Sequence, residues 1–265
     1  MCIRDRNKVT IISIVRQIYF NQRLEEQKPM KQIDLAYLPI IGRGEQINII
    51  CAMHDIEVNY LLSTPLGDDF DKDKEAAFGT IPWMKDRAND LELNDSMAIV
   101  QYLVNQYPGP LTPKNNETAA RVNMYWAWVQ DYYSFVLSPF HDIIIDNNDV
   151  FWRNSRLTDS LANGGKATGI SNLTALHTKR LKFLEQQLVN TTTAPFMTGK
   201  VCSYADIFLY TCVRAVQETG GFGLLREACN GDPFSSFPIV KNIADAVGEI
   251  DAVKASGSKF SECPI

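Results

Sequence analysis

The stretch DLAYLPIIGRGEQINIICAMHDIEVNY, residues 34–60, decides the fold of the N-terminal part of the chain. Apolar residues alternate with others up to Tyr37, which predicts a short strand that ends at a glycine-rich turn. Residues 47–53 are apolar almost all round, a pattern typical of a helix that is covered on two sides. Residues 57–63 have the composition of a second strand. The stretch therefore predicts a strand, helix, strand unit with parallel, right-handed pairing.

The next segment predicts two more strands and a helix. Residues 83–85 and 91–93 flank a polar turn, which indicates a β-hairpin with a loop longer than two residues. Asp95 and Ser96 can cap the helix that follows, and the sequence Tyr-Pro-Gly-Pro at residues 107–110 ends it. No strand pattern follows this point.

Everything after about residue 111 is helical in pattern. Residues 118–146 are rich in aromatic side chains and predict one long helix, and residues 171–190 predict another with leucines along one stripe. Ser203 and Asp206 stand at the spacing of a capping box, in which each side chain satisfies backbone amides at a helix start. The change of pattern predicts a domain boundary near residue 111.

Residues 1–29 differ from the rest of the chain in pattern and composition. Their apolar run, residues 9–15, is too short to span a bilayer, and Arg16 interrupts it before a signal-like apolar region develops. We expect this segment to be a leader that is either disordered or an artefact of the gene model, with the fold beginning at Met30.

The composition is that of a globular protein. Of the 265 residues, 45% are hydrophobic and 22% charged, with a net charge of -5, which argues against a membrane-spanning chain and against nucleic acid as a partner. The six cysteines form no CxxC pair, so reduced thiols and a cytoplasmic location are expected. The three histidines do not stand at metal-ligand spacing, so no metal is expected.

The remaining motifs carry a resemblance to one family. The sequence offers no Ser-His-Asp series, phosphate-binding loop or metalloprotease motif at a persuasive position. Residues 34–60 resemble the opening of cytosolic glutathione S-transferases of the sigma, alpha and pi types, in which a tyrosine ends the first strand and a Gly-Arg pair precedes the first helix. FGTIP (78–82), NDSMAIVQYL (94–103) and SYADI (203–207) resemble three further motifs, in the family's order and spacing.

The resemblance implies a fold of class α+β/α. A thioredoxin-like N-terminal domain (βαβ-ββα) would cover residues 30–110, and an all-α helical bundle would form the C-terminal domain over residues 111–265. The resemblance also implies glutathione as co-substrate, no metal, and a homodimer.

Two residues acquire a catalytic role from the resemblance. Tyr37 matches the tyrosine whose hydroxyl donates a hydrogen bond to the glutathione sulfur and so favours the nucleophilic thiolate. Arg43 matches an arginine that strengthens the positive field around that sulfur, whereas Ile41 stands where many relatives have a second arginine. From pattern alone, Tyr37 would be a half-buried strand residue and Arg43 an exposed arginine at a helix start.

Five further residues would contact glutathione along its backbone. Ile81 and Pro82 match the cis-proline turn, in which the residue before the proline pairs with the cysteinyl main chain. Thr80 stands where relatives have a longer Gln or Lys. Asp95 and Ser96 match the pair that receives the γ-glutamyl end: Asp95 would pair with the ammonium, while Ser96 and the helix N-terminus bind the carboxylate.

The four remaining candidates lie in a loop and in the long helix. Phe70 and Lys74 fall near the family's tryptophan and lysine ligands of glutathione. Asp131 lies close to the acid that in relatives reaches the partner subunit's glutathione. Tyr133 faces the expected second-substrate region, although an aromatic residue at helical spacing also fits a helix core.

The activity implied is conjugation of the glutathione thiolate to a small hydrophobic electrophile, a detoxification reaction. A glutathione-dependent isomerase or peroxidase, such as a prostaglandin D synthase-like enzyme, would use the same thiolate. A non-catalytic carrier like the lens crystallins would keep the fold with a degraded site. The residues do not separate conjugation from isomerase or peroxidase activity, and they do not name the electrophile. Tyr37, Arg43 and Ser96 argue against the carrier, whereas Ile41 and Thr80 leave it open.

Overall fold

The N-terminal part of the fold is a mixed sheet with helices on both sides. The computed structural model describes residues 31–38, 40–62, 69–137, 155–191, 194–218 and 222–256, so the leader predicted at residues 1–29 lies outside it. The elements of this part are β1 (Gln32–Tyr37), α2 (Arg43–Met53), β2 (Glu57–Leu62), α3 (Lys72–Glu75), β3 (Trp83–Asp86), β4 (Leu91–Asn94) and α4 (Ser96–Gln106). The strand order is β2-β1-β3-β4. β1 and β2 pair in parallel, as the strand, helix, strand unit predicts, and β3 and β4 pair antiparallel, as the hairpin predicts. β1 also pairs antiparallel with β3.

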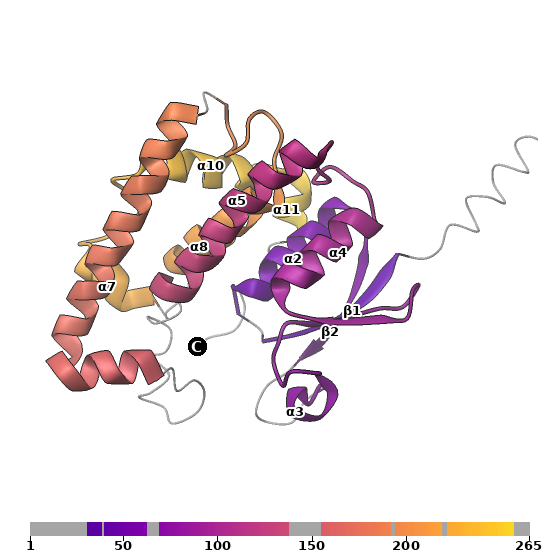
Figure 1. Cartoon of the computed structure of the whole chain (residues 1–265), viewed down its shortest axis with the longest axis horizontal. Coiled ribbons are helices and arrows are strands. Elements are labelled where there is room, and N and C mark those ends of the chain that lie inside the picture. Colours follow the sequence, from indigo (N-terminus) through magenta and orange to yellow (C-terminus); the bar gives the residue numbers. More distant parts are fainter. Residues whose placement is uncertain are drawn as a thin grey trace, which may run out of the picture.

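Side chains of β1 alternate between two apolar clusters. Ile33, Leu35 and Tyr37 point into the main core, which α2 and α4 complete. Ala36 points the other way, into a small cluster that includes Trp83. This alternation follows from the two-residue period of a strand, and it explains why the sheet is covered on both faces. Figure 1 shows α2 and α4 on one side of the sheet and α3 on the other.

The rest of the described chain is helical. Its elements are α5 (Asn116–Tyr132), the π-helix η1 (Tyr133–Leu137), α7 (Ser155–Thr191), α8 (Tyr204–Glu218), α9 (Gly223–Ala228), α10 (Pro238–Gly248) and α11 (Asp251–Ser256). The largely buried α8 lies at the centre and contacts α5 and α10, and it also contacts α2 of the sheet part (Figure 1). None of the helices in the described segments is long and apolar enough to cross a bilayer.

Two helix predictions need correction. The helix predicted over 118–146 begins at Asn116, capped by Asn115, and changes to π-helical geometry at Tyr133. The part of that prediction beyond Leu137 lies outside the described residues. The helix predicted over 171–190 begins much earlier, at Ser155. Its first turns include two adjacent glycines and several polar residues, which lower helix propensity, so pattern alone did not extend the helix there.

Asp206 forms its half of the predicted capping box at the start of α8, while the Ser203 hydroxyl donates to the Asp206 carboxylate. This carboxylate accepts hydrogen bonds from the backbone N–H and the hydroxyl of Ser203, at 2.8 and 2.6 Å. It also accepts one from the backbone N–H of Met197 at 2.8 Å, a contact that the spacing does not predict. The box therefore fixes both the start of α8 and the turn before it.

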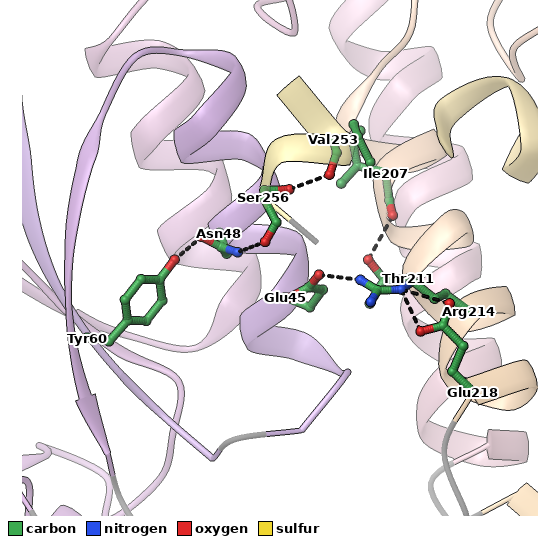
Figure 2. Close-up of polar contacts among 9 residues, drawn as sticks. All are labelled: Glu45, Asn48, Tyr60, Ile207, Thr211, Arg214, Glu218, Val253 and Ser256. Atoms are coloured by element: carbon green, nitrogen blue, oxygen red, sulfur yellow. Dashed lines mark hydrogen bonds and ion pairs between the residues drawn. The ribbon is translucent and has the colours of Figure 1, made fainter. Parts of the chain in front are cut away.

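Polar contacts tie the sheet part to the last helix, as Figure 2 shows. The Asn48 side chain on α2 donates to the backbone carbonyl of Ser256 on α11 at 3.2 Å and accepts from the Tyr60 hydroxyl on β2. The Ser256 hydroxyl in turn donates to the carbonyl of Val253 at 2.9 Å. A single buried amide thus links β2, α2 and α11.

Candidate active site

Tyr37 ends β1 directly beneath the start of α2. Its hydroxyl oxygen accepts a hydrogen bond of 2.9 Å from the backbone N–H of Arg43. Only 7% of the residue is exposed. Burial raises the pKa of Tyr37, and the positive charge of Arg43 offsets that rise only in part. The phenol therefore keeps its proton at neutral pH and can donate it to a further group.

Two glycines allow this close approach of α2 to Tyr37. A Cβ on Gly44 would lie 2.3 Å from Cδ1 of the Tyr37 ring, so any side chain there would displace the ring. A Cβ on Gly42 would lie 2.9 Å from the Tyr37 hydroxyl and 3.0 Å from the Tyr133 hydroxyl. The two phenol oxygens therefore flank the same backbone position. The sequence indicated only a turn here. The structure shows that close contacts with Tyr37 leave no room for a side chain at either glycine.

Arg43 joins three elements at this point. Nη1 donates to Oε1 of Gln130 at 2.6 Å and, more weakly, to Oγ of Ser96 at 3.4 Å. Nη2 donates to Oγ of Ser134 at 2.6 Å. The guanidinium also lies over the ring of Tyr133, 5.1 Å from its centroid, which is a cation–π arrangement. The predicted pair of Tyr37 and Arg43 is therefore one cluster that extends to α4, α5 and η1.

Asp95 and Ser96 occupy the N-terminus of α4. Asp95 is exposed and caps the helix by accepting from the backbone N–H groups of Met97 and Ala98, at 2.8 and 3.4 Å. It does so with φ of 75°, a left-handed conformation that few residues other than glycine adopt. Ser96 is fully buried and faces Arg43. Both residues are thus at a helix N-terminus, the position that favours an anion.

The peptide bond between Ile81 and Pro82 is cis, as the resemblance implies. The segment before it is held by Asn94 at the end of β4. The Asn94 side chain donates to the Thr80 carbonyl at 2.7 Å and accepts from the Ala77 N–H at 3.2 Å. Asn94 was not among the residues predicted from the sequence, where its place immediately before Asp95 is the one feature that marks it.

Phe70 and Lys74 do not join the cluster around Tyr37. The Phe70 ring packs on Trp83 with ring centroids 4.7 Å apart, and only 2% of the residue is exposed. The ring thus belongs to the small cluster that includes Ala36, and its contact with glutathione stays a prediction. Lys74 is well exposed on α3 and forms a 2.6 Å ion pair with Asp71, which is the first cause of its raised pKa.

The two candidates from the long helix have opposite environments. Asp131 is exposed. Tyr133 is 7% exposed, lies between Arg43 and Phe208, and packs against the Phe208 ring at 5.5 Å. Sequence analysis missed Gln130 and Ser134, which have no motif of their own and become recognisable only through Arg43. Within the described segments, no group of three or more His, Cys, Asp or Glu side chains could hold a metal ion.

Comparisons with known proteins agree with the fold. Residues 172–255 match the model of the glutathione S-transferase C-terminal domain. NaGST-2 is 20% identical, with a TM-score of 0.65, over 88% of this chain and 99% of that one. Rat hPGDS complexed with a quinoline is 21% identical, with a TM-score of 0.62, over 84% of this chain and 94% of that one.

A third solved structure contains bound glutathione. It is a glutathione S-transferase from Methylobacillus flagellatus with GSH bound, 16% identical, with a TM-score of 0.60, over 84% of this chain and 98% of that one. A search of curated protein sequences gave no match. The chain therefore has the glutathione S-transferase fold, and residues 172–255 are similar to the C-terminal domain of that family.

Proposed function

We propose that this protein is a sigma-like glutathione transferase that conjugates glutathione to small hydrophobic electrophiles. The observation that carries the proposal is the Tyr37 hydroxyl, which accepts from the Arg43 backbone and still has a proton to donate. Arg43 and the N-terminus of α4 both lie at this point, so the local field favours an anion.

The reaction needs the glutathione sulfur as a thiolate. A thiol is mostly protonated at neutral pH, and a donor aimed at the sulfur beside a positive charge lowers its pKa. A shift of about two units corresponds to about 3 kcal/mol of stabilisation of the thiolate. The thiol proton leaves to solvent, the sulfur attacks the electrophilic carbon, and a C–S bond forms as the leaving group departs with its bonding electrons.

Glutathione would lie across the start of α4 and the cis-proline turn. Ser96 and the helix N-terminus would bind the γ-glutamyl carboxylate, and Asp95 would pair with the ammonium. The backbone at Ile81 and Pro82 would pair with the cysteinyl part, while Thr80 is exposed beside it. The structure of the Methylobacillus flagellatus relative with GSH bound supports glutathione as the ligand class.

The proposal also covers the second substrate, the partner subunit and the cellular location. Tyr133, packed beside Arg43, would border the second substrate. A cytoplasmic homodimer fits the resemblance, and in it Asp131, which is exposed, would reach towards the partner's glutathione. Lys74, also exposed, would be a peripheral contact.

Two alternatives share the fold. A glutathione-dependent isomerase or peroxidase would use the same thiolate, and the likeness to rat hPGDS keeps this chemistry in view. A carrier without activity would bind ligand but leave the thiol unactivated.

Binding and turnover together test the proposal. We would measure glutathione affinity by calorimetry and conjugation of a generic aryl halide for wild type, Tyr37→Phe and the control Tyr210→Phe, whose ring lies beside Gly248. We expect Tyr37→Phe to keep its affinity and lose about 10- to 100-fold in turnover at neutral pH. Wild-type binding without turnover of the aryl halide or of isomerase and peroxidase substrates would instead identify a carrier.

A further inference from the structure

We infer that Gln130 and Ser134 are positioning residues that hold the Arg43 guanidinium beside Tyr37 and leave its positive charge unneutralised. The inference rests on the proposed function, because it concerns the field around the thiolate. It also goes beyond that function, because it assigns a role to two residues of the helical part that no motif marks.

The geometry places both residues on one face of α5 and η1. Gln130 and Ser134 are four residues apart and Tyr133 lies between them, so all three side chains can face the same neighbour. That neighbour is Arg43, with the amide and hydroxyl oxygens each at 2.6 Å and the Tyr133 ring centroid at 5.1 Å. The helix changes to π-helical geometry at Tyr133, a feature often found at functional sites.

The charges around the partly buried Arg43 differ from those around Arg214, a buried arginine near α2. Arg214 pairs with two carboxylates, those of Glu45 and Glu218. In the described residues, by contrast, the side-chain acceptors of the Arg43 guanidinium are neutral, and no carboxylate forms an ion pair with it. Its charge therefore remains available to a nearby anion.

Hydrogen bonds satisfy the buried Gln130 amide only in part. Gln130 is 5% exposed, and its Nε2 has no hydrogen-bond partner within the described part of the chain. A glutamate of nearly the same shape would bind Arg43 through a charge-assisted hydrogen bond, but it would neutralise the guanidinium and bury a carboxylate. The amide therefore keeps the positive charge of Arg43 unneutralised.

The direct test replaces that amide by a carboxylate. We would measure the pKa of the bound glutathione thiol, from the pH dependence of thiolate absorbance, in wild type and Gln130→Glu. We expect the thiol pKa to rise by about one unit and turnover at neutral pH to fall several-fold. Ala120→Glu is the control, because it adds the same charge at an exposed position about 15 Å along the helix.

Two neutral variants cover the case in which Gln130→Glu does not fold. Gln130→Met and Ser134→Ala each remove one hydrogen bond to Arg43, and we expect both to raise the thiol pKa, with the larger effect in the double variant. If Tyr37→Phe raises the thiol pKa and the Gln130 and Ser134 variants leave it unchanged, the inference is wrong and the proposed function stands. If Tyr37→Phe also leaves it unchanged, the proposed function itself fails.

Discussion

Arg214 on α8 donates a hydrogen bond of 2.8 Å to Glu45 on α2, and both side chains are buried. Nε of Arg214 also binds both carboxylate oxygens of Glu218, at 3.0 and 2.9 Å, as Figure 2 shows. The second oxygen of Glu45 has no hydrogen-bond partner among the described residues. A partly satisfied ion pair therefore joins the sheet part to the helical part close to the candidate active site.

This pair predicts a pH-dependent stability. Burial raises the pKa of Glu45 to about 7 from 4.5, although Arg214 lowers it, and the charge of Glu218 adds to the rise. Between these two values the folded protein holds the proton that the unfolded chain has lost, so the contribution of Glu45 to stability falls as pH rises through this window. Arg214 stays charged throughout, since its pKa is raised.

Replacing Glu45 by glutamine removes that titration. We expect the free energy of unfolding of Glu45→Gln, relative to wild type, to rise by up to about 3 kcal/mol between pH 4.5 and pH 7. Urea denaturation at several pH values measures the difference. Glu249→Gln is the control, since Glu249 lies at the surface in an ion pair with Lys254. A difference that stays constant with pH would show that Glu45 does not titrate in this range.

Gly44→Ala is expected to damage the site through contact alone. The new Cβ would lie 2.3 Å from the Tyr37 ring, so the ring or the start of α2 must move. We expect a loss of about 1 to 3 kcal/mol in unfolding free energy and a fall in turnover larger than the loss of folded protein explains. Gly223→Ala is the matched control, because its nearest neighbour is the end of the Arg226 side chain at 4.0 Å. Normal turnover in Gly44→Ala would mean that the position of Tyr37 is unimportant.

Asn94 is expected to support glutathione binding indirectly, without contacting the ligand. Asn94→Ala leaves the Ala77 N–H and the Thr80 carbonyl without their side-chain partner, at a cost of about 1 to 3 kcal/mol. Because these groups hold the segment before Pro82, KM for glutathione should rise more than kcat falls. Asn105→Ala, at an exposed site whose side chain donates to the Gln101 carbonyl of its own helix, should change neither. Equal KM values for Asn94→Ala and Asn105→Ala would show that Asn94 does not support glutathione binding.

Local pattern predicted the sheet part and the caps well. β1, α2 and the hairpin follow from strand and helix periods over a few residues, and the Asp206 capping box is encoded within four positions. The cis bond before Pro82 is confirmed, but that prediction came from family resemblance and not from the residues alone. The boundary placed near residue 111 stays a prediction.

The features that the sequence did not predict depend on contacts between residues far apart in the chain. Arg43 meets Gln130 and Ser134 across 87 and 91 residues, and a glutamine and a serine in a helix carry no signal of that meeting. The glutathione contact of Phe70 stays a prediction, and its packing on Trp83, in the cluster that includes Ala36, joins residues far apart in the chain. A one-turn change to π-helix at Tyr133 likewise depends on packing.

The pKa of the bound glutathione thiol in wild type and Tyr37→Phe tests the central claim most directly. Thiolate absorbance recorded against pH, with saturating glutathione, gives the value for each protein. We predict a wild-type thiol pKa about two units below that of free glutathione, and a clear rise towards the free value in Tyr37→Phe. A wild-type value equal to that of free glutathione, unchanged by the substitution, would contradict the assignment of Tyr37 as the residue that stabilises the thiolate.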